Sequence, residues 1–265
     1  MNDIQLLELI RLQDTCESYE DIKLKLNWDV LKTRNEEDGF DFFHFEDDRL
    51  VGFLGIYYFG EEYEMCGMVH PEFRRRGIFT ELFKQALAAL DDSAPVLLNA
   101  PADSLSAKGW LSTIPCSYGF SEYQMHWEKQ ELPENNLVNL RRATFEDLAD
   151  MMALNEIGFG YELQDDEENR RELEEASVYM IEADGKTVGK IHMKTELDQS
   201  WIYGFVVYPA YQGKGYGKSA LTQMVQLEEA NDVYIEVATE NEHALSLYKQ
   251  CGFIPYQKQD YYDCH

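Results

Sequence analysis

The segment QGKGYG, residues 212–217, carries the sharpest chemical signal in the chain. It follows an apolar stretch typical of a strand and precedes a pattern typical of a helix. Three glycines leave the main chain uncovered, so its N–H groups and the positive end of the helix dipole could hold a pyrophosphate. The alternative is a flexible glycine-rich turn. The P-loop pattern and the dinucleotide-binding GxGxxG pattern do not fit this segment.

Two longer segments resemble the GNAT-type N-acetyltransferases. VVYPAYQGKGYGKSAL (206–221) is similar to the acetyl-CoA loop of that family, and NEHALSLYKQCGF (241–253) is similar to its second signature. The resemblance covers residues 138–265 well and residues 40–130 more loosely. It implies acetyl-CoA as co-substrate, with the strand backbone binding pantetheine and the loop binding pyrophosphate. The positions that it assigns to acetyl-CoA are Phe205, Val206, Val207, Gln212, Gly213, Lys214, Gly215, Tyr216, Gly217 and Asn241.

The resemblance also assigns a catalytic role to Tyr248, as the general acid that protonates the departing CoA thiolate. A tyrosine of pKa ~10 can supply that proton, although a packing aromatic on a helix face is the alternative. Attack is direct in this family, so the amine must first be neutral. At pH 7 an alkylamine of pKa ~10.4 is neutral in only about one molecule in 2,500. Glu196, Glu236 and His192 are candidate bases, and the sequence does not choose among them.

The chain repeats itself once. The segments around the two glycine loops match without a gap at a spacing of 138 residues: Val69 with Val207, Pro71 with Pro209, Phe73 with Tyr211, and Gly77 with Gly215. YGFSEY (118–123) later echoes CGFIPY (251–256). One repeat of this length indicates two tandem copies of a domain rather than a solenoid. A polar segment around Pro133 separates the copies, so the expected domains are 1–133 and 134–265.

Hydrophobic periodicity gives the elements that must position these residues. In the second copy it predicts strands at 178–183, 187–195, 200–208 and 233–237, with helices at 215–229 and 242–250. The first copy has a similar order and an apolar helix face over 78–90, whereas residues 1–35 look helical without a clear strand. Together with the resemblance, this predicts an α+β protein of two tandem GNAT-type domains, each a mixed, mostly antiparallel sheet flanked by helices.

The first copy departs from the family pattern at two positions. Phe79 stands where the last glycine of the loop is expected, and Pro115 stands where the second copy has Tyr248. Arg74, Arg75 and Arg76 could still meet phosphates, or they could form a solvated helix start. We therefore expect an active second domain and a degenerate first domain that helps to form the substrate cleft or stabilises the pair.

Composition excludes several classes of function. Asp and Glu number 50 against 23 Lys and Arg, a net charge of −27, which argues against a nucleic-acid partner. The acid excess and the acidic segment 161–177 are compatible with a cationic acceptor. The alternative is that these acidic residues only form a solvated surface. The five scattered cysteines show no zinc-ligand spacing, so reduced thiols and no metal are expected. No apolar run approaches the ~20 residues of a membrane span, and a cytoplasmic location is expected.

The expected function is therefore transfer of an acetyl group from acetyl-CoA to a primary amine, carried by a small molecule or a peptide, in the second domain. The alternative is a non-catalytic acyl-CoA-binding or regulatory module on the same fold. The acceptor and the oligomeric state are not determined by the sequence.

Overall fold

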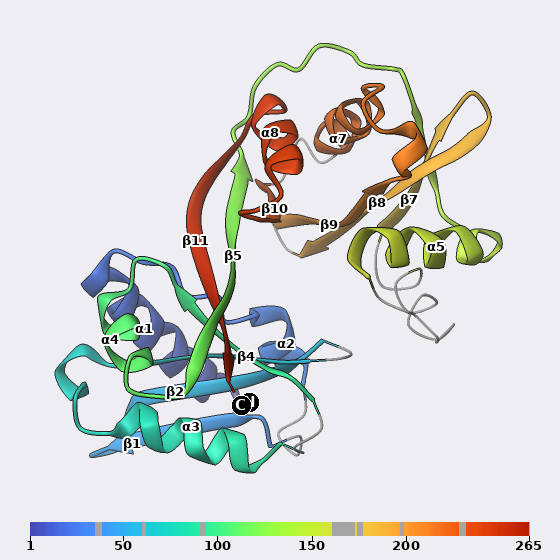
Figure 1. The fold of residues 1–265 in the computed structure, drawn as a ribbon. Helices are drawn as coiled ribbons and strands as arrows, with labels where there is room; N and C mark the ends of the chain where they lie inside the picture. Colours follow the sequence, from blue (N-terminus) through green and yellow to red (C-terminus); the bar gives the residue numbers. More distant parts are fainter. Residues whose placement is uncertain are drawn as a thin grey trace. The chain divides into compact units, whose positions relative to one another are not determined.

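The computed structural model describes residues 1–34, 39–59, 62–90, 94–160, 173, 177–196, 199–227 and 232–264. Its contacts divide the chain into two compact units. Unit 1 comprises Met1–Glu122 and Gln257–His265, and unit 2 comprises Tyr123–Tyr256. Each unit contains a mixed sheet with helices on both faces (Figure 1), which confirms the predicted α+β class.

Unit 1 begins with helices α1 (Asp3–Glu20) and α2 (Trp28–Thr33). Its strands are β1 (Asp41–Glu46), β2 (Arg49–Tyr58), β3 (Tyr63–Val69), β4 (Val96–Pro101) and parts of β5 (Cys116–Trp127) and β11 (Phe253–Cys264). Strands β1, β2 and β3 pair antiparallel, and β3 pairs parallel with β4. The helices α3 (Ile78–Ala88) and α4 (Leu105–Leu111) share a core with one face of this sheet, and α1 and α2 share a core with the other.

Unit 2 repeats this arrangement with β6 (Asn139–Arg142), β7 (Ser177–Ala183), β8 (Lys186–Glu196), β9 (Gln199–Val207) and β10 (Asp232–Ala238). Strands β6 to β9 pair antiparallel in sequence order, and β10 runs parallel to β9. Helix α5 (Leu148–Phe159) covers one face, and α7 (Tyr216–Leu227) and α8 (Glu242–Gln250) cover the other (Figure 1). The strands and helices expected in the second copy are all present, within two residues at each end.

The apolar periodicity of the helices explains which side they bury. On α7 the side chains of Ala220, Leu221 and Val225 are fully buried against strand residues such as Ile202. On α5 the buried Met151 and Leu154 pack against the opposite face of the sheet. Burial of each such aliphatic side chain contributes ~1.5–3 kcal/mol, so the two helical layers hold the sheet between them.

Each unit is completed by a strand from the other copy. Strand β11, which ends the second copy, pairs antiparallel with β4 in unit 1, from Gln259 opposite Pro101 to Asp263 opposite Leu97. The part of β5 that belongs to unit 2, Tyr123–Trp127, lies beside β10. The division thus differs from the expected ranges 1–133 and 134–265 in two places. Sequence repeats detect similarity between copies, and they carry no information about which copy a strand pairs with.

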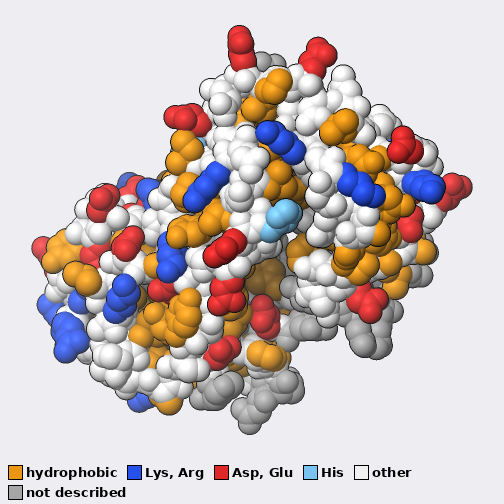
Figure 2. Space-filling view, turned by 45° about the horizontal axis from the view of Figure 1, so that its top comes forward, with side chains coloured by type: hydrophobic (Ala, Val, Ile, Leu, Met, Phe, Trp, Pro, Cys, Tyr) orange, Lys and Arg blue, Asp and Glu red, His pale blue; other side chains and the backbone are white. Residues whose placement is uncertain are grey.

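Surface charge and helix hydropathy can be read directly from the described residues. Among the coloured residues of the face in Figure 2, basic and acidic side chains are interspersed and gather into no continuous basic patch. In the described part of the chain, no helix is both long enough and apolar enough to cross a membrane. The acidic segment singled out from the sequence falls almost entirely on residues 161–172 and 174–176, outside the described residues.

The cysteines correct one expectation. Cys116 on β5 and Cys264 on β11 form a disulfide within unit 1, so the prediction that all five cysteines are reduced is wrong for this pair. The pair is not evident from the sequence, because the two cysteines are 148 residues apart and strand pairing brings them together. Cys16, Cys66 and Cys251 are free and buried, and burial raises the pKa of the Cys66 thiol to about 12.

We predict that this disulfide stabilises unit 1 by holding the end of β11. Cys264→Ser should lower the free energy of unfolding by about 2–5 kcal/mol, since the cross-link closes a long loop of the unfolded chain. Urea unfolding of both proteins with and without reductant measures the effect. Reductant should destabilise the natural chain and leave the Cys264→Ser protein unchanged. Equal midpoints for the natural chain in both conditions would contradict a stabilising cross-link.

Candidate functional site

The glycine loop of unit 2 has the backbone conformation that an anion nest needs. Gly213 and Gly215 have φ of 73° and 81°, in the left-handed region that glycine tolerates. A Cβ at Gly213 would meet no heavy atom within 4 Å, so the loop is open on that side. The Gln212 side chain donates to the Val207 carbonyl at 2.9 Å and ties the loop to β9. Helix α7 starts at Tyr216, where first-turn N–H groups have no intrahelical partner.

A register shift in β9 lies just before this loop. Lys190 of β8 pairs with Val206 of β9, but His192 pairs with Tyr203, so one extra residue is inserted in β9. Gly204 lies at this bulge with φ of 51°. The insertion reverses the alternation: Val206 packs in the core with α5, whereas Phe205 packs in the core with α7 and α8. A bulge leaves ladder groups unpaired, so backbone N–H groups of β9 can face a ligand.

Strands β9 and β10 also separate at this point. Their parallel pairing runs from Gln199 opposite Asp232 to Ile202 opposite Ile235, although the described strands continue to Val207 and Ala238. The first residues beyond the paired region are Tyr203 and Glu236. The gap opens on the side of β9 away from β8, beside the bulge.

Tyr248 lies on the face of α8 that packs against this part of the sheet. Its ring is 6.4 Å from the Phe205 ring and 6.2 Å from the Phe253 ring, centroid to centroid. Only 7% of the residue is exposed, and this burial raises the pKa of the phenol well above 10. The phenol therefore stays protonated throughout the neutral range, as a proton donor must.

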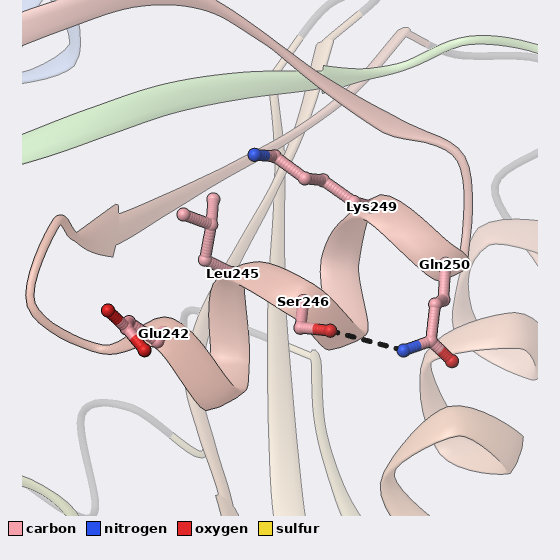
Figure 3. A pocket seen from close by; sticks show the side chains of 5 residues that line it. All are labelled: Glu242, Leu245, Ser246, Lys249 and Gln250. Atoms are coloured by element: carbon pink, nitrogen blue, oxygen red, sulfur yellow. Dashed lines mark hydrogen bonds between the residues drawn. The ribbon is translucent and has the colours of Figure 1, made fainter.

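Asn241 is the N-cap of α8, because its side-chain oxygen accepts from the Ala244 N–H at 3.1 Å. Its amide N–H₂ is the part that a pantetheine arm could use. A shallow hollow on α8, drawn in Figure 3, is lined by Glu242, Leu245, Ser246, Lys249 and Gln250. Tyr248 is not among its lining residues, so this hollow is separate from the tyrosine.

The structure distinguishes the three candidate bases. Glu236 lies at the mouth of the gap, where its carboxylate accepts a hydrogen bond from Gln124 at 2.9 Å. His192 stands across β9 from the gap, with its ring 5.7 Å from that of Tyr203. Burial, with Lys190 and Lys194 nearby, lowers the pKa of His192 to about 4. Glu196 is in β8, but its side chain lies outside the described residues.

Unit 1 keeps the loop backbone but fills the space beside it. Arg75 and Gly77 have φ of 65° and 84°, close to the values at Gly213 and Gly215. Phe79, the counterpart of Gly217, lies with its ring 4.6 Å from Trp110, and a Cβ on Gly67 of β3 would be 3.0 Å from the Phe79 ring. The register of β2 and β3 runs without a shift, and Cys66 stands where unit 2 has Gly204.

Two residues of the site were missed by sequence reasoning. Gly204 interrupts the apolar strand 200–208, and an isolated glycine in a strand is itself a signal of a bulge. Gln124 had no signal, because it comes from the strand that ends the first copy and reaches Glu236 only through the exchange of strands.

Comparison with known proteins gives concordant matches. The model of the "Acetyltransferase (GNAT) family" matches residues 5–105 and 138–253. The N-alpha-acetyltransferase RimI of Mycobacterium tuberculosis is 45% identical over 52 residues, which are 20% of this chain and 33% of that protein. The spermidine N(1)-acetyltransferase of Vibrio cholerae is 26% identical over 125 residues, 45% of this chain and 69% of that protein. The chain thus spans about a third of the RimI protein that it matches.

Solved structures share the fold over nearly the whole chain. A GCN5-related N-acetyltransferase from Sphaerobacter thermophilus matches with a TM-score of 0.74 at 16% sequence identity. The match covers 97% of this chain and 91% of the chain of that protein. A tandem GNAT protein from the clavulanic acid biosynthesis pathway matches with a TM-score of 0.67 at 17% sequence identity, over 99% of this chain and 95% of that chain. These likenesses show the fold, and the second shows the tandem arrangement.

The two roles of Asn241 can be separated by substitution. Asn241→Ala should lower the free energy of unfolding by about 1 kcal/mol, because it removes the N-cap. Asn241→Ser should keep the cap and the stability, since serine caps equally well. If the amide also binds pantetheine, both variants should bind acetyl-CoA more weakly, by about tenfold. Urea unfolding measures the change in stability, and calorimetric titration measures the change in acetyl-CoA binding. Unchanged acetyl-CoA affinity in Asn241→Ser would show that Asn241 acts only as the N-cap.

Proposed function

The chain belongs to the GNAT acetyltransferase family, and on that premise we propose that its second unit transfers an acetyl group from acetyl-CoA to a primary amine. The observation that carries the proposal is the coincidence, in unit 2, of the open glycine loop, the bulge at Gly204 and the gap between β9 and β10. The residues present fit the co-substrate. Left-handed glycines, with open space beside Gly213, suit a pyrophosphate. An out-of-register strand suits the amide groups of pantetheine.

The reaction requires little covalent chemistry from the protein. The amine nitrogen attacks the acetyl carbonyl carbon, the carbon–sulfur bond breaks, and the products are an acetamide and free CoA. Tyr248 gives its proton to the departing thiolate and regains one from solvent. The proton lost by the amine leaves through a base. A bulge N–H of β9 polarises the carbonyl, so most of the catalysis is positioning and electrostatic stabilisation.

The comparison of the two units supports the second as the active one. In unit 1 the Phe79 ring covers β3 at Gly67 and lies edge-on to Trp110, whereas unit 2 has Gly217 at that position, with Leu247 and Phe205 beside it. In addition, Arg74 is held by Glu20 and by the Val69 carbonyl, so its guanidinium is already engaged. The first unit then has a structural role in the two-unit protein and does not itself transfer an acetyl group.

The names of the relatives support an amine acceptor. One matched protein is an N-alpha-acetyltransferase and another is a spermidine N(1)-acetyltransferase, and both names describe acetylation of a nitrogen. A small-molecule or peptide amine is therefore the acceptor class that we propose.

The loop assignment is tested by a matched pair of substitutions. Gly215→Glu and Gly77→Glu impose the same change at residues of nearly equal φ. A Cβ at Gly215 would lie 3.2 Å from Leu137 Cδ1, whereas a Cβ at Gly77 would meet nothing within 4 Å, so urea unfolding of both variants accompanies the binding measurement. We expect Gly215→Glu to weaken acetyl-CoA binding about 100-fold, or about 2.7 kcal/mol, because a carboxylate repels the pyrophosphate. Gly77→Glu should bind normally in isothermal titration calorimetry. A selective loss in Gly77→Glu would move the site to unit 1.

Tyr248→Phe tests the acid. Turnover should fall about 100-fold, in the range of a lost general acid, while acetyl-CoA affinity stays within twofold. Because the pKa of Tyr248 is raised, the natural enzyme should show no alkaline loss of kcat below pH 10. Thiol release measures turnover and its dependence on pH, and calorimetric titration measures acetyl-CoA affinity. Unchanged turnover would remove the acid role, and binding without any turnover in the natural chain would favour a non-catalytic acyl-CoA-binding module.

A further inference from the structure

The linker between β5 and β6, residues 128–138, belongs to unit 2 and runs past α7 (Figure 1). Two apolar side chains anchor it to that unit. Val138 is buried in the core that α7 and α8 share with the sheet, and Leu132 packs against the same core. Both anchors therefore hold the linker on the side of the sheet that carries α7.

Side chains of α7 bind the backbone of this linker. The Ser219 hydroxyl, in a residue with no exposed surface, donates to the Asn135 carbonyl at 2.6 Å. The Gln223 side chain donates to the Asn135 and Val138 carbonyls, each at 2.9 Å. Because residues four apart lie on one face of a helix, these hydrogen bonds fix the linker along a single line of the α7 surface.

The linker brings Leu137 to the glycine loop. A Cβ added at Gly215 would lie 3.2 Å from Leu137 Cδ1. Leu137 is nevertheless 55% exposed, so much of its apolar surface is free beside the loop. In unit 1 a Cβ at Gly77, which has nearly the same φ, would meet no heavy atom within 4 Å. Among the described residues, the loop of unit 1 therefore has no neighbour that corresponds to Leu137.

The two sides of the loop face different parts of unit 2. A Cβ at Gly217 would lie 3.3 Å from Leu247 Cδ2 and 3.6 Å from the Phe205 ring, so that side faces α8 and β9. In the proposed function the pantetheine arm leaves on that side, because β9 leads to the gap. Gly215 faces Leu137 instead. The group at the other end of the pyrophosphate is a nucleoside, whose base has a flat face that stacks on apolar groups.

We infer that Leu137 forms an apolar wall for the nucleoside end of acetyl-CoA, and that Ser219 and Gln223 are positioning residues that hold it there through the linker backbone. The inference rests on the proposed function, because it takes the pyrophosphate to lie at the loop. Contact between the base and an exposed leucine removes apolar surface of both from water, which favours binding. The linker occurs once in the chain, so this contact belongs to unit 2 and is not part of the repeat.

Isothermal titration calorimetry of the full chain with acetyl-CoA tests the wall. Leu137→Ala should weaken binding about five- to tenfold, because most of the apolar area of the leucine is lost. Leu137→Met should bind within about twofold of the natural chain, since methionine keeps an apolar side chain of similar volume. Leu227→Ala, the same change at an exposed leucine at the other end of α7, should leave binding unchanged. Urea unfolding of each variant separates a change in binding from a change in folding.

Two fragments of CoA locate the contact. The adenosine bisphosphate fragment should bind Leu137→Ala more weakly than the natural chain, by about the same factor as acetyl-CoA. Pantetheine phosphate should bind both chains equally.

A double-mutant cycle tests the positioning role. Gln223→Leu removes the donor to the linker and should weaken acetyl-CoA binding. Adding Leu137→Ala to Gln223→Leu should then weaken binding by less than twofold more, because both changes act through the same side chain. Losses that multiply in the double variant would overturn the positioning role of Gln223.

The outcomes distinguish the wall from the proposed function. Unchanged or tighter acetyl-CoA binding in Leu137→Ala, with the expected loss in Gly215→Glu, would overturn the wall and leave the loop assignment intact. Acetyl-CoA binding that depends on Leu137, without acetyl transfer to any amine, would uphold the wall and overturn the proposed transfer. Weaker binding of pantetheine phosphate to Leu137→Ala would overturn the assignment of the contact to the nucleoside.

Discussion

One inserted residue in β9 determines which face of the sheet in unit 2 is occupied by each residue of β9 that follows it. Up to Tyr203 the alternation sends Trp201 and Tyr203 toward the α5 face, and after the bulge at Gly204 the pattern is reversed. Phe205 consequently meets Tyr248 on the α8 side, and Val206 meets α5. Without that shift the strand would pair in register, and the backbone groups next to the glycine loop would be used within the sheet.

The two copies show that a loop backbone alone does not define a binding site. The loops at 74–77 and 212–215 adopt nearly the same conformation, even though the first places Arg75 in the left-handed region, at a cost of about 1 kcal/mol. What differs is the space around them. Phe79 and Trp110 fill unit 1 with apolar rings, whereas unit 2 has Gly217, where even a Cβ would come within 3.3 Å of Leu247. The side chains beside the start of the helix, rather than the loop backbone, therefore distinguish the two copies.

Local signals predicted the elements well because they depend on neighbouring residues. The apolar spacing of α7 and the glycines at 213 and 215 act over a few residues, and the structure contains both features. Features that depend on distant pairing were not predictable. The Cys116–Cys264 disulfide, the place of β11 beside β4 and the contact of Gln124 with Glu236 all follow from the exchange of strands. The gap at Glu236 likewise needs the register of β9 and β10, which periodicity does not supply.

We propose that the backbone of unit 2, from the bulge through the start of α7, is the surface that receives acetyl-CoA. Amide hydrogen exchange with and without acetyl-CoA tests it most directly, because exchange reports on the backbone N–H groups themselves. With acetyl-CoA bound, we expect slowed exchange at residues 204–207 and 213–218, and no change at residues 66–69 and 75–80. Protection confined to the loop of unit 1, or no protection in either loop, would contradict it.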